Sequence, residues 1–146
     1  MSRHTPLLHA VRLAGTALLC SLALSTHASQ GDAAKGLWLS GDKAAVIEFK
    51  DCPDAAGSLC GVIVWDKDAG TAADACGTTI AKLKRFDGEA WRDGWAYDPR
   101  TKKYYKASLR TEKDSLLLRA FIGVEILGET EEMTKVASLP AGCKAR

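Results

Sequence analysis

The feature that most restricts the fold of this chain is a series of short runs of strand-forming residues separated by turn residues. The runs are rich in aliphatic and aromatic side chains, and no segment after residue 28 shows sustained helical periodicity. This pattern is typical of an all-β sandwich or barrel. The expected strands are 37–40, 44–50, 59–65, 80–86, 89–97, 104–110, 116–122 and 132–137.

Alternation within the runs predicts which faces are buried. Tyr105, Ala107 and Leu109 form an apolar row whose neighbours are polar, so this strand has one solvated face. The run 59–65 is apolar on both faces, with Trp65 on the face of Gly61 and Ile63, and is covered on both sides. An antiparallel meander of about eight strands removes its edges by closing into a barrel, although a two-sheet sandwich fits the same pattern.

Turn chemistry supports this division. Asp87-Gly88 favours the positive φ angles of a tight hairpin turn between two runs, and Asp98-Pro99 opens the next turn. A longer loop rich in Gly, Ala and Asp occupies 66–77.

The first 28 residues have the composition of a cleaved signal peptide. Arg3 and Arg12 give a positively charged start, 13–24 is an apolar run, and 26–28 offer a small-residue cleavage site. We therefore predict a signal peptide at 1–28 and a periplasmic or secreted protein.

Two other interpretations of this leader are weaker. The apolar run is shorter than the roughly 18 to 20 residues that cross a bilayer, so the chain is not expected to span a membrane. Leu19 occupies the place where a small residue would precede a lipidated Cys20. Cleavage leaves 118 of the 146 residues, 29–146, which is enough for a single domain with a core.

Removal of the leader also changes the charge. Arg3 and Arg12 leave with it, so 18 Lys and Arg face 18 Asp and Glu. A neutral chain without a long basic run gives no reason to expect nucleic acid as a partner.

Four of the five cysteines remain after cleavage, an even number that favours disulfides in an exported chain. Cys52 and Cys60 flank a short turn-rich segment between two predicted strands, which leaves Cys76 and Cys143. Four cysteines allow three pairings, and the sequence alone does not choose among them. A metal site would be indicated by a Cys-x-x-Cys pair or by histidine ligands, and the sequence after residue 28 contains neither. We therefore expect no metal and no cofactor.

Several spaced motifs resemble a known family. They are GLWL at 36–39, LCGVIVW at 59–65, YDP at 97–99 followed by YY at 104–105, LRAFIG at 118–123 and LG at 127–128. Together they resemble the bacterial periplasmic family catalogued as domain of unknown function 2147. The resemblance implies a small exported protein with a lipocalin-like β-barrel and no established biochemical activity.

The resemblance also gives roles to two residues. Gly36-x-Trp38 is similar to the Gly-x-Trp signature of lipocalins, in which the tryptophan closes the barrel floor under a basic side chain from the last strand. The family usually carries Trp-x-Arg where this chain has Met133-Thr134-Lys135. Lys135 would then take the barrel-closing role over Trp38 by a cation–π contact.

Enzymatic activity is not expected. His4, His9 and His27 all lie in the leader, so Ser-His and Cys-His nucleophile systems are absent from the mature chain, and disulfides would use its cysteines. Carboxylate pairs remain, but acids in polar loops are more often solvated turn residues. A calcium loop at 66–74 fits poorly because its glycine is one position early and the twelfth position has no glutamate. The acids considered are Asp66, Asp68, Glu129 and Glu131.

Large rings and one arginine are the candidates for ligand binding. Barrels that hold apolar ligands line their cavities with aromatic side chains, although such rings are more often core. Arg119 interrupts an apolar strand; if its face points inward, its guanidinium could bind a carboxylate or phosphate, and if outward it is a surface residue. The candidates are Trp65, Trp95, Tyr97, Tyr105 and Arg119.

Two hypotheses of function follow. The first is a non-enzymatic binding protein that holds a small hydrophobic or amphipathic ligand inside the barrel. The second is a structural or interaction module with a filled barrel that contacts an envelope protein or a glycan. A cavity of several hundred cubic ångströms favours the first, and a packed interior favours the second.

Overall fold

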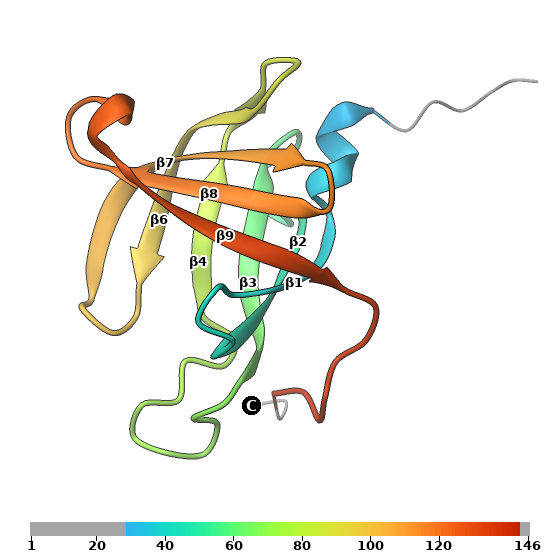
Figure 1. Cartoon of the computed structure of the whole chain (residues 1–146), viewed down its shortest axis with the longest axis vertical. Helices are drawn as coiled ribbons and strands as arrows, with labels where there is room; N and C mark the ends of the chain where they lie inside the picture. The colour runs from blue at the N-terminus through green and yellow to red at the C-terminus, as the bar shows by residue number, and fades with distance from the viewer. Residues whose placement is uncertain (1–28, 144–146) are drawn as a thin grey trace, which may run out of the picture.

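A computed structural model of the protein describes residues 29–143, so the predicted signal peptide lies outside the described residues (Figure 1). Within this range the chain forms strands and two short 3-10 helices. In chain order these are η1 (Gln30–Ala34), β1 (Gly36–Leu39), β2 (Ala45–Asp51), β3 (Leu59–Asp66), β4 (Thr79–Leu83), β5 (Arg85–Phe86), β6 (Trp91–Asp98), β7 (Lys103–Glu112), β8 (Ser115–Phe121), η2 (Glu125–Leu127) and β9 (Glu129–Val136).

Eight of these strands close into an antiparallel barrel. Hydrogen-bonded neighbours follow the order β4-β3-β2-β1-β9-β8-β7-β6. The circle closes because β6 also pairs with β4, with Ala81 opposite Ala96 and Lys82 opposite Trp95. The short β5 is an additional strand on β6. The predicted all-β barrel is confirmed, and the two-sheet sandwich is not formed because the sheet closes on itself.

Side-chain alternation fills the interior as expected. On β7, Ala107 and Leu109 point inward and pair with Ala120 and Leu118 of β8. Leu109 is fully buried, and Lys106 and Arg110 on the opposite face are exposed. One face of β7 and one face of β8 therefore supply the core, as the period of two requires.

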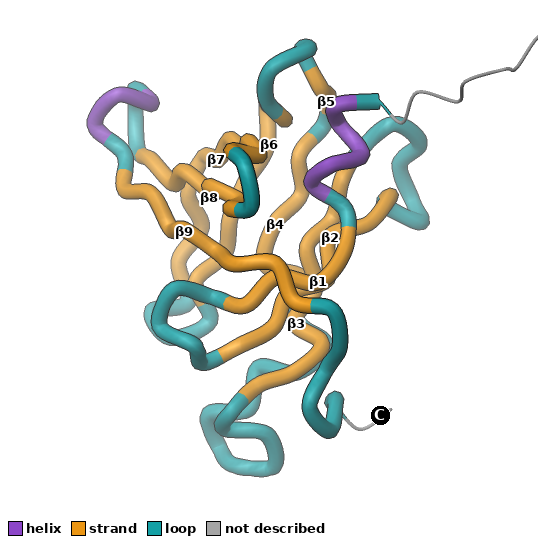
Figure 2. The backbone as a smooth tube through the Cα atoms, turned by 45° about the vertical axis from the view of Figure 1, so that its right-hand side comes forward, coloured by secondary structure: helices purple, strands orange, loops and turns teal. Residues whose placement is uncertain are grey.

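One end of the barrel is closed by η1. The indole N–H of Trp38 donates to the carbonyl of Ala34 at 2.9 Å, and that of Trp91 donates to the carbonyl of Gly31 at 3.0 Å. A Cβ on Gly31 would lie 3.1 Å from the ring of Phe86, so a glycine lets η1 approach the rings closely. Both buried indoles thus satisfy their donors on the same short helix, which lies against the start of β1 (Figure 2).

Two disulfides join parts of the chain, so the predicted disulfide bonds are confirmed. Cys52–Cys60 connects the end of β2 to the start of β3. Cys76–Cys143 fixes the C-terminal segment to the β3–β4 loop, and the Cys143 N–H donates to the carbonyl of Val64 at 2.8 Å. The C-terminal segment therefore lies beside the end of β3.

A bulge changes the facing of β3. The neighbouring β2 residues Val46 and Ile47 pair with Trp65 and Ile63 of β3, respectively. One β3 residue, at position 64, therefore has no partner on β2. The expected alternation from Gly61 to Trp65 is therefore interrupted.

Candidate functional site

The barrel is hollow at the end opposite η1. A cavity of about 840 Å³ opens there. The strand ends and the connections around this mouth line it: the β1–β2 turn, the β3–β4 loop, the β6–β7 turn and the β8–β9 segment. The cavity mouth and η1 therefore lie at opposite ends of the strands; Figures 1 and 2 show the path of these strands and of η1.

The floor of the cavity is apolar. Its deepest side chains also belong to the buried core, and they come from six different strands: Ile47, Ile63, Ile80, Ala96, Leu118 and Met133. The other half of the barrel is filled by fully buried side chains, among them Trp38, Phe49, Leu109 and Leu116. The interior is thus packed at one end and open at the other.

The upper wall of the cavity, between the floor and the mouth, combines small and large apolar groups. Tyr105 and Ala120 line it, together with Phe121, Ile122 and Leu127 from the end of β8 and the segment after it. A long apolar chain entering from the mouth would contact these groups before it reached the floor.

Charged groups surround the mouth. The Arg100 guanidinium lies 3.0 Å from a carboxylate oxygen of Asp42 and 3.6 Å from one of Asp98, so it links the β1–β2 and β6–β7 turns. The hydroxyl of Ser40, the backbone N–H of Ala44 and the charge of Arg100 lower the pKa of Asp42, against the effect of burial. Asp42 is therefore held ionised beside Arg100, whose guanidinium also lines the cavity.

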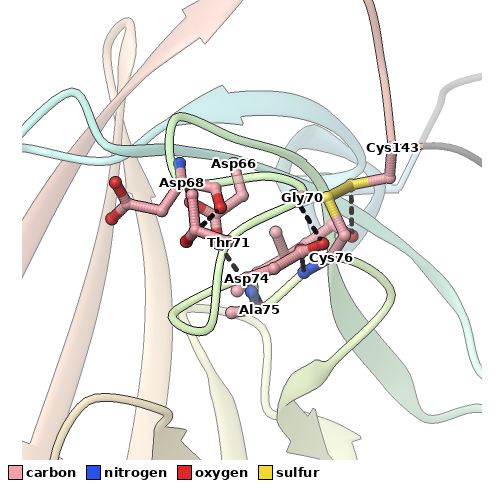
Figure 3. Close-up of a disulfide and its surroundings, with 9 residues drawn as sticks. Asp66, Asp68, Gly70, Thr71, Asp74, Ala75, Cys76 and Cys143 are labelled. Carbon is pink, nitrogen blue, oxygen red and sulfur yellow. Dashed lines mark hydrogen bonds between the residues drawn. A yellow bond between two sulfur atoms is a disulfide. The ribbon is translucent and has the colours of Figure 1, made fainter.

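The β3–β4 loop forms another side of the mouth and is organised by two aspartates (Figure 3). Asp66 accepts the backbone N–H of Asp68 at 2.9 Å and that of Ala75 at 2.8 Å. Asp74 accepts the N–H of Gly70 at 2.9 Å and that of Cys76 at 2.8 Å. These carboxylates bind the backbone of their own loop, which gives them a structural role there.

The structure separates the five predicted ligand-binding residues. Tyr97 and Tyr105 line the cavity. Trp65 and Trp95 are not among the lining residues, which corrects the expectation that they face a ligand. The bulge in β3 brings Asp66, rather than Trp65, to the cavity side.

Trp95 lies instead in an aromatic cluster on the outer wall of β6 and β7. Its ring centroid is 5.3 Å from that of Tyr104, which is 66% exposed. The Tyr97 and Tyr104 centroids are 4.6 Å apart, so Tyr97 contributes to this cluster as well as to the cavity rim. In β6, a register shift between Trp91 and Gly94 precedes Trp95.

Arg119 lies outside the barrel. Its Nε donates to the carbonyl of Glu125 at 2.7 Å, and its Nη2 donates to that of Ile126 at 2.9 Å. Its Nη1 donates to the hydroxyl of Thr130 at 2.8 Å. The guanidinium therefore holds η2 against the outer wall, and Arg119 is not among the residues that line the cavity.

Lys135 and Trp38 meet at the closed end. They are opposite each other in the β1–β9 pairing, and the Lys135 ammonium lies 5.1 Å from the centroid of the Trp38 ring. The Trp38 side chain is fully buried.

The four acids considered for catalysis, Asp66, Asp68, Glu129 and Glu131, all line the cavity. The Asp66 carboxylate is occupied by backbone N–H groups, and Glu131 accepts the N–H of Gly41 at 3.0 Å. Asp66 thus stabilises the β3–β4 loop that follows it, and Glu131 of β9 stabilises the β1–β2 turn. That the protein is not an enzyme stays a prediction.

One group of metal-ligating residue types occurs in the described part of the chain. Cys52, Asp54 and Cys60 offer atoms within 4.8 Å of one another. Both sulfur atoms belong to the Cys52–Cys60 disulfide, so neither is a thiolate that could bind a cation.

Sequence reasoning missed most of the cavity floor. Ile47, Ile80 and Met133 were expected only as strand residues, and the signal that finds them is their position on the inward face near the mouth end of each strand. Arg100 and Asp42 were also missed because their pairing joins two turns that are 58 residues apart in sequence.

Comparisons with known proteins agree with this architecture. The model of a family described as "Uncharacterized protein conserved in bacteria (DUF2147)" matches residues 36–135. A comparison with curated proteins gave no match. No helix in residues 29–143 is long and apolar enough to cross a bilayer.

A solved structure has a similar fold. It is protein HP1028 of Helicobacter pylori, described as belonging to the lipocalin family, and it superposes with a TM-score of 0.55. The alignment covers 70% of this chain and 82% of that chain, with 13% sequence identity. At this identity the similarity shows a shared lipocalin-like fold.

Proposed function

The chain belongs to the bacterial family of uncharacterized proteins DUF2147, and from the geometry of its barrel we propose that it binds a small hydrophobic or amphipathic molecule there. The observation that carries this proposal is the open cavity of about 840 Å³ above an apolar floor. Ligand sites in proteins typically have volumes of about 300 to 1,000 Å³ and largely apolar linings with a few polar groups.

The lining is suited to an alkyl chain with a polar end. Ile47, Ile63 and Leu118 would bury the chain, and transfer of eight methylene groups from water would contribute roughly 6 kcal/mol. Lys67 and Lys102 lie among the lining residues and could bind an acidic head group at the mouth, where Arg100 already pairs with Asp42 and Asp98. Tyr105, on the inner face of β7, adds a phenolic hydroxyl to the wall. The mechanism would be sequestration, without chemical change of the ligand.

We place this activity outside the cytoplasm. Two disulfides persist best in an oxidising compartment, and the composition of residues 1–28 predicts export. The periplasm, as the resemblance implied, is therefore the proposed location.

The alternative was a module with a filled barrel that contacts an envelope protein or a glycan. Only the half of the interior next to η1 is filled, and the half at the mouth is open. This arrangement speaks for the binding protein over the filled-barrel module.

Native mass spectrometry of the oxidised protein purified from its own periplasm tests the proposal. We expect a species heavier than the polypeptide by one small molecule, which extraction with organic solvent then identifies. A bare polypeptide that also fails to take up fatty acids, lysophospholipids or other amphiphiles in solution would contradict it.

A further inference from the structure

The segment between β8 and β9 exposes an unusual amount of apolar surface. We call residues 122–127 the β8–β9 tip. Four of its six residues have exposed aliphatic side chains: Ile122 (79%), Val124 (57%), Ile126 (83%) and Leu127 (79%). Clustered exposed apolar side chains on a soluble protein mark an interaction surface.

The polar groups of this segment point the other way. The Glu125 carboxylate accepts hydrogen bonds from Arg92 at 3.0 and 3.1 Å and from the hydroxyl of the buried Ser108. Arg119 binds the carbonyls of Glu125 and Ile126. The tip therefore has its charge and two of its carbonyls turned to the barrel wall, and its aliphatic side chains are exposed to solvent.

These contacts also fix the shape of the tip. Arg119 connects it to Thr130 of β9. Gly128 follows it at a close approach to β8, where a Cβ would lie 2.6 Å from the carbonyl oxygen of Ala120. The apolar side chains are thus presented on a braced segment, which lowers the entropy lost on binding.

The position of the tip connects it to the cavity. Ile122 and Leu127 are exposed and also line the cavity mouth. In both views the segment with η2 projects beyond the barrel (Figures 1 and 2). A surface that covers the tip would therefore also adjoin the entrance through which a ligand passes.

We infer that the β8–β9 tip inserts its aliphatic side chains into the interfacial layer of a phospholipid bilayer. For the passage of ligand between the bilayer and the cavity, this inference rests on the proposed function. Docked in this way, the protein would place the mouth at the lipid surface, and an amphipathic molecule would enter the cavity without crossing water.

The chemistry of the tip favours lipid over a protein partner. Protein interfaces are anchored by Trp, Tyr and Arg in packed pockets. Apart from Glu125, which is bound to Arg92, the side chains of the tip are all aliphatic. Insertion among lipids needs buried apolar area but no matching pocket.

The charges around the cavity, whose mouth Ile122 and Leu127 line, predict which membrane is favoured. Among the residues that line the cavity, six are acidic and three are basic. Attraction to anionic lipid is therefore weak, and apolar burial must supply the affinity. Binding should persist at high salt on zwitterionic vesicles and weaken when anionic lipid is added.

Flotation of the full, oxidised protein with phosphatidylcholine vesicles tests the inference. We expect co-flotation at low and high salt, and at least a roughly tenfold loss of affinity in the Val124→Ser/Ile126→Ser double variant. Neither residue lines the cavity. The matched control is Tyr104→Ser/Leu139→Ser, which removes two exposed apolar side chains elsewhere and should bind like the parent.

A parent protein that stays with the aqueous phase, or a tip variant that floats as well as the control, would overturn the inference. Self-association that depends on the tip, seen by size-exclusion chromatography without vesicle binding, would also overturn it and assign the surface to a second copy. Uptake of a fluorescent fatty acid without vesicles is measured in parallel. Failure of that uptake refutes the proposed function, whereas failure of flotation refutes only the membrane contact.

Discussion

The ammonium of Lys135 on β9 lies 5.1 Å from the centroid of the buried Trp38 ring on β1, where the first and last strands of the barrel pair. An exposed cation–π contact contributes about 0.5 to 1 kcal/mol. Lys135→Met keeps the aliphatic part of the side chain and should lower the free energy of unfolding in urea by that amount. Lys113→Met in the β7–β8 turn is the control. An equal loss of unfolding free energy in both variants would show that the contact between Lys135 and Trp38 does not stabilise the protein.

Filling the upper cavity should block ligand uptake and preserve the fold. Ala120 lines the cavity and is half-buried, so Ala120→Phe places a ring in the space that an alkyl chain would occupy. We expect the affinity for a dansyl-labelled fatty acid, measured by fluorescence titration, to fall at least about tenfold. The same substitution at exposed Ala56, in the β2–β3 connection, should have no effect. Equal affinity of both variants would place the ligand elsewhere.

The barrel was predictable because its signal is repeated in every strand. Each inward row, such as Ala107 and Leu109 on β7, appears in the sequence as apolar residues at alternate positions. Local chemistry at turns was predictable only in part. Asp87-Gly88 was expected to form a two-residue turn, whereas Asp87 accepts the N–H groups of Glu89 and Ala90 and the turn is longer.

The candidate site was less predictable because bulges and distant loops determine it. A bulge leaves the residue composition of a strand unchanged. Nothing in the sequence therefore showed that Trp65 and Ile63 would lie on different sides of β3. Arg119 was ambiguous for a related reason. Its partners Glu125 and Ile126 belong to a segment whose path depends on tertiary contacts, and those contacts decided which side the guanidinium takes.

Loss of the two disulfides should destabilise the protein unequally. Cys76–Cys143 spans 67 residues of sequence and Cys52–Cys60 spans 8. The loop-entropy relation gives losses of about 4 and about 2.5 kcal/mol, respectively. The paired Cys→Ser variants, compared by urea unfolding, should keep this order. A larger loss from the short-loop pair would show that local packing, rather than loop entropy, determines the effect.

Asp87 should contribute to the loss of stability in acid. The N–H of Ala90, the Arg92 guanidinium and the N–H of Glu89 hold its pKa well below the ordinary value of 3.8. Because the folded pKa lies below the unfolded one, the stabilisation is fully present above about pH 4 and is lost as the pH falls through the folded pKa. Asp87→Asn removes this titration, so the free energy of unfolding should fall less between pH 5 and pH 2 than in the parent. Asp114→Asn in the β7–β8 turn controls for the substitution itself. Parallel pH curves for the parent and Asp87→Asn would show that these hydrogen bonds do not favour the ionised carboxylate in the folded protein.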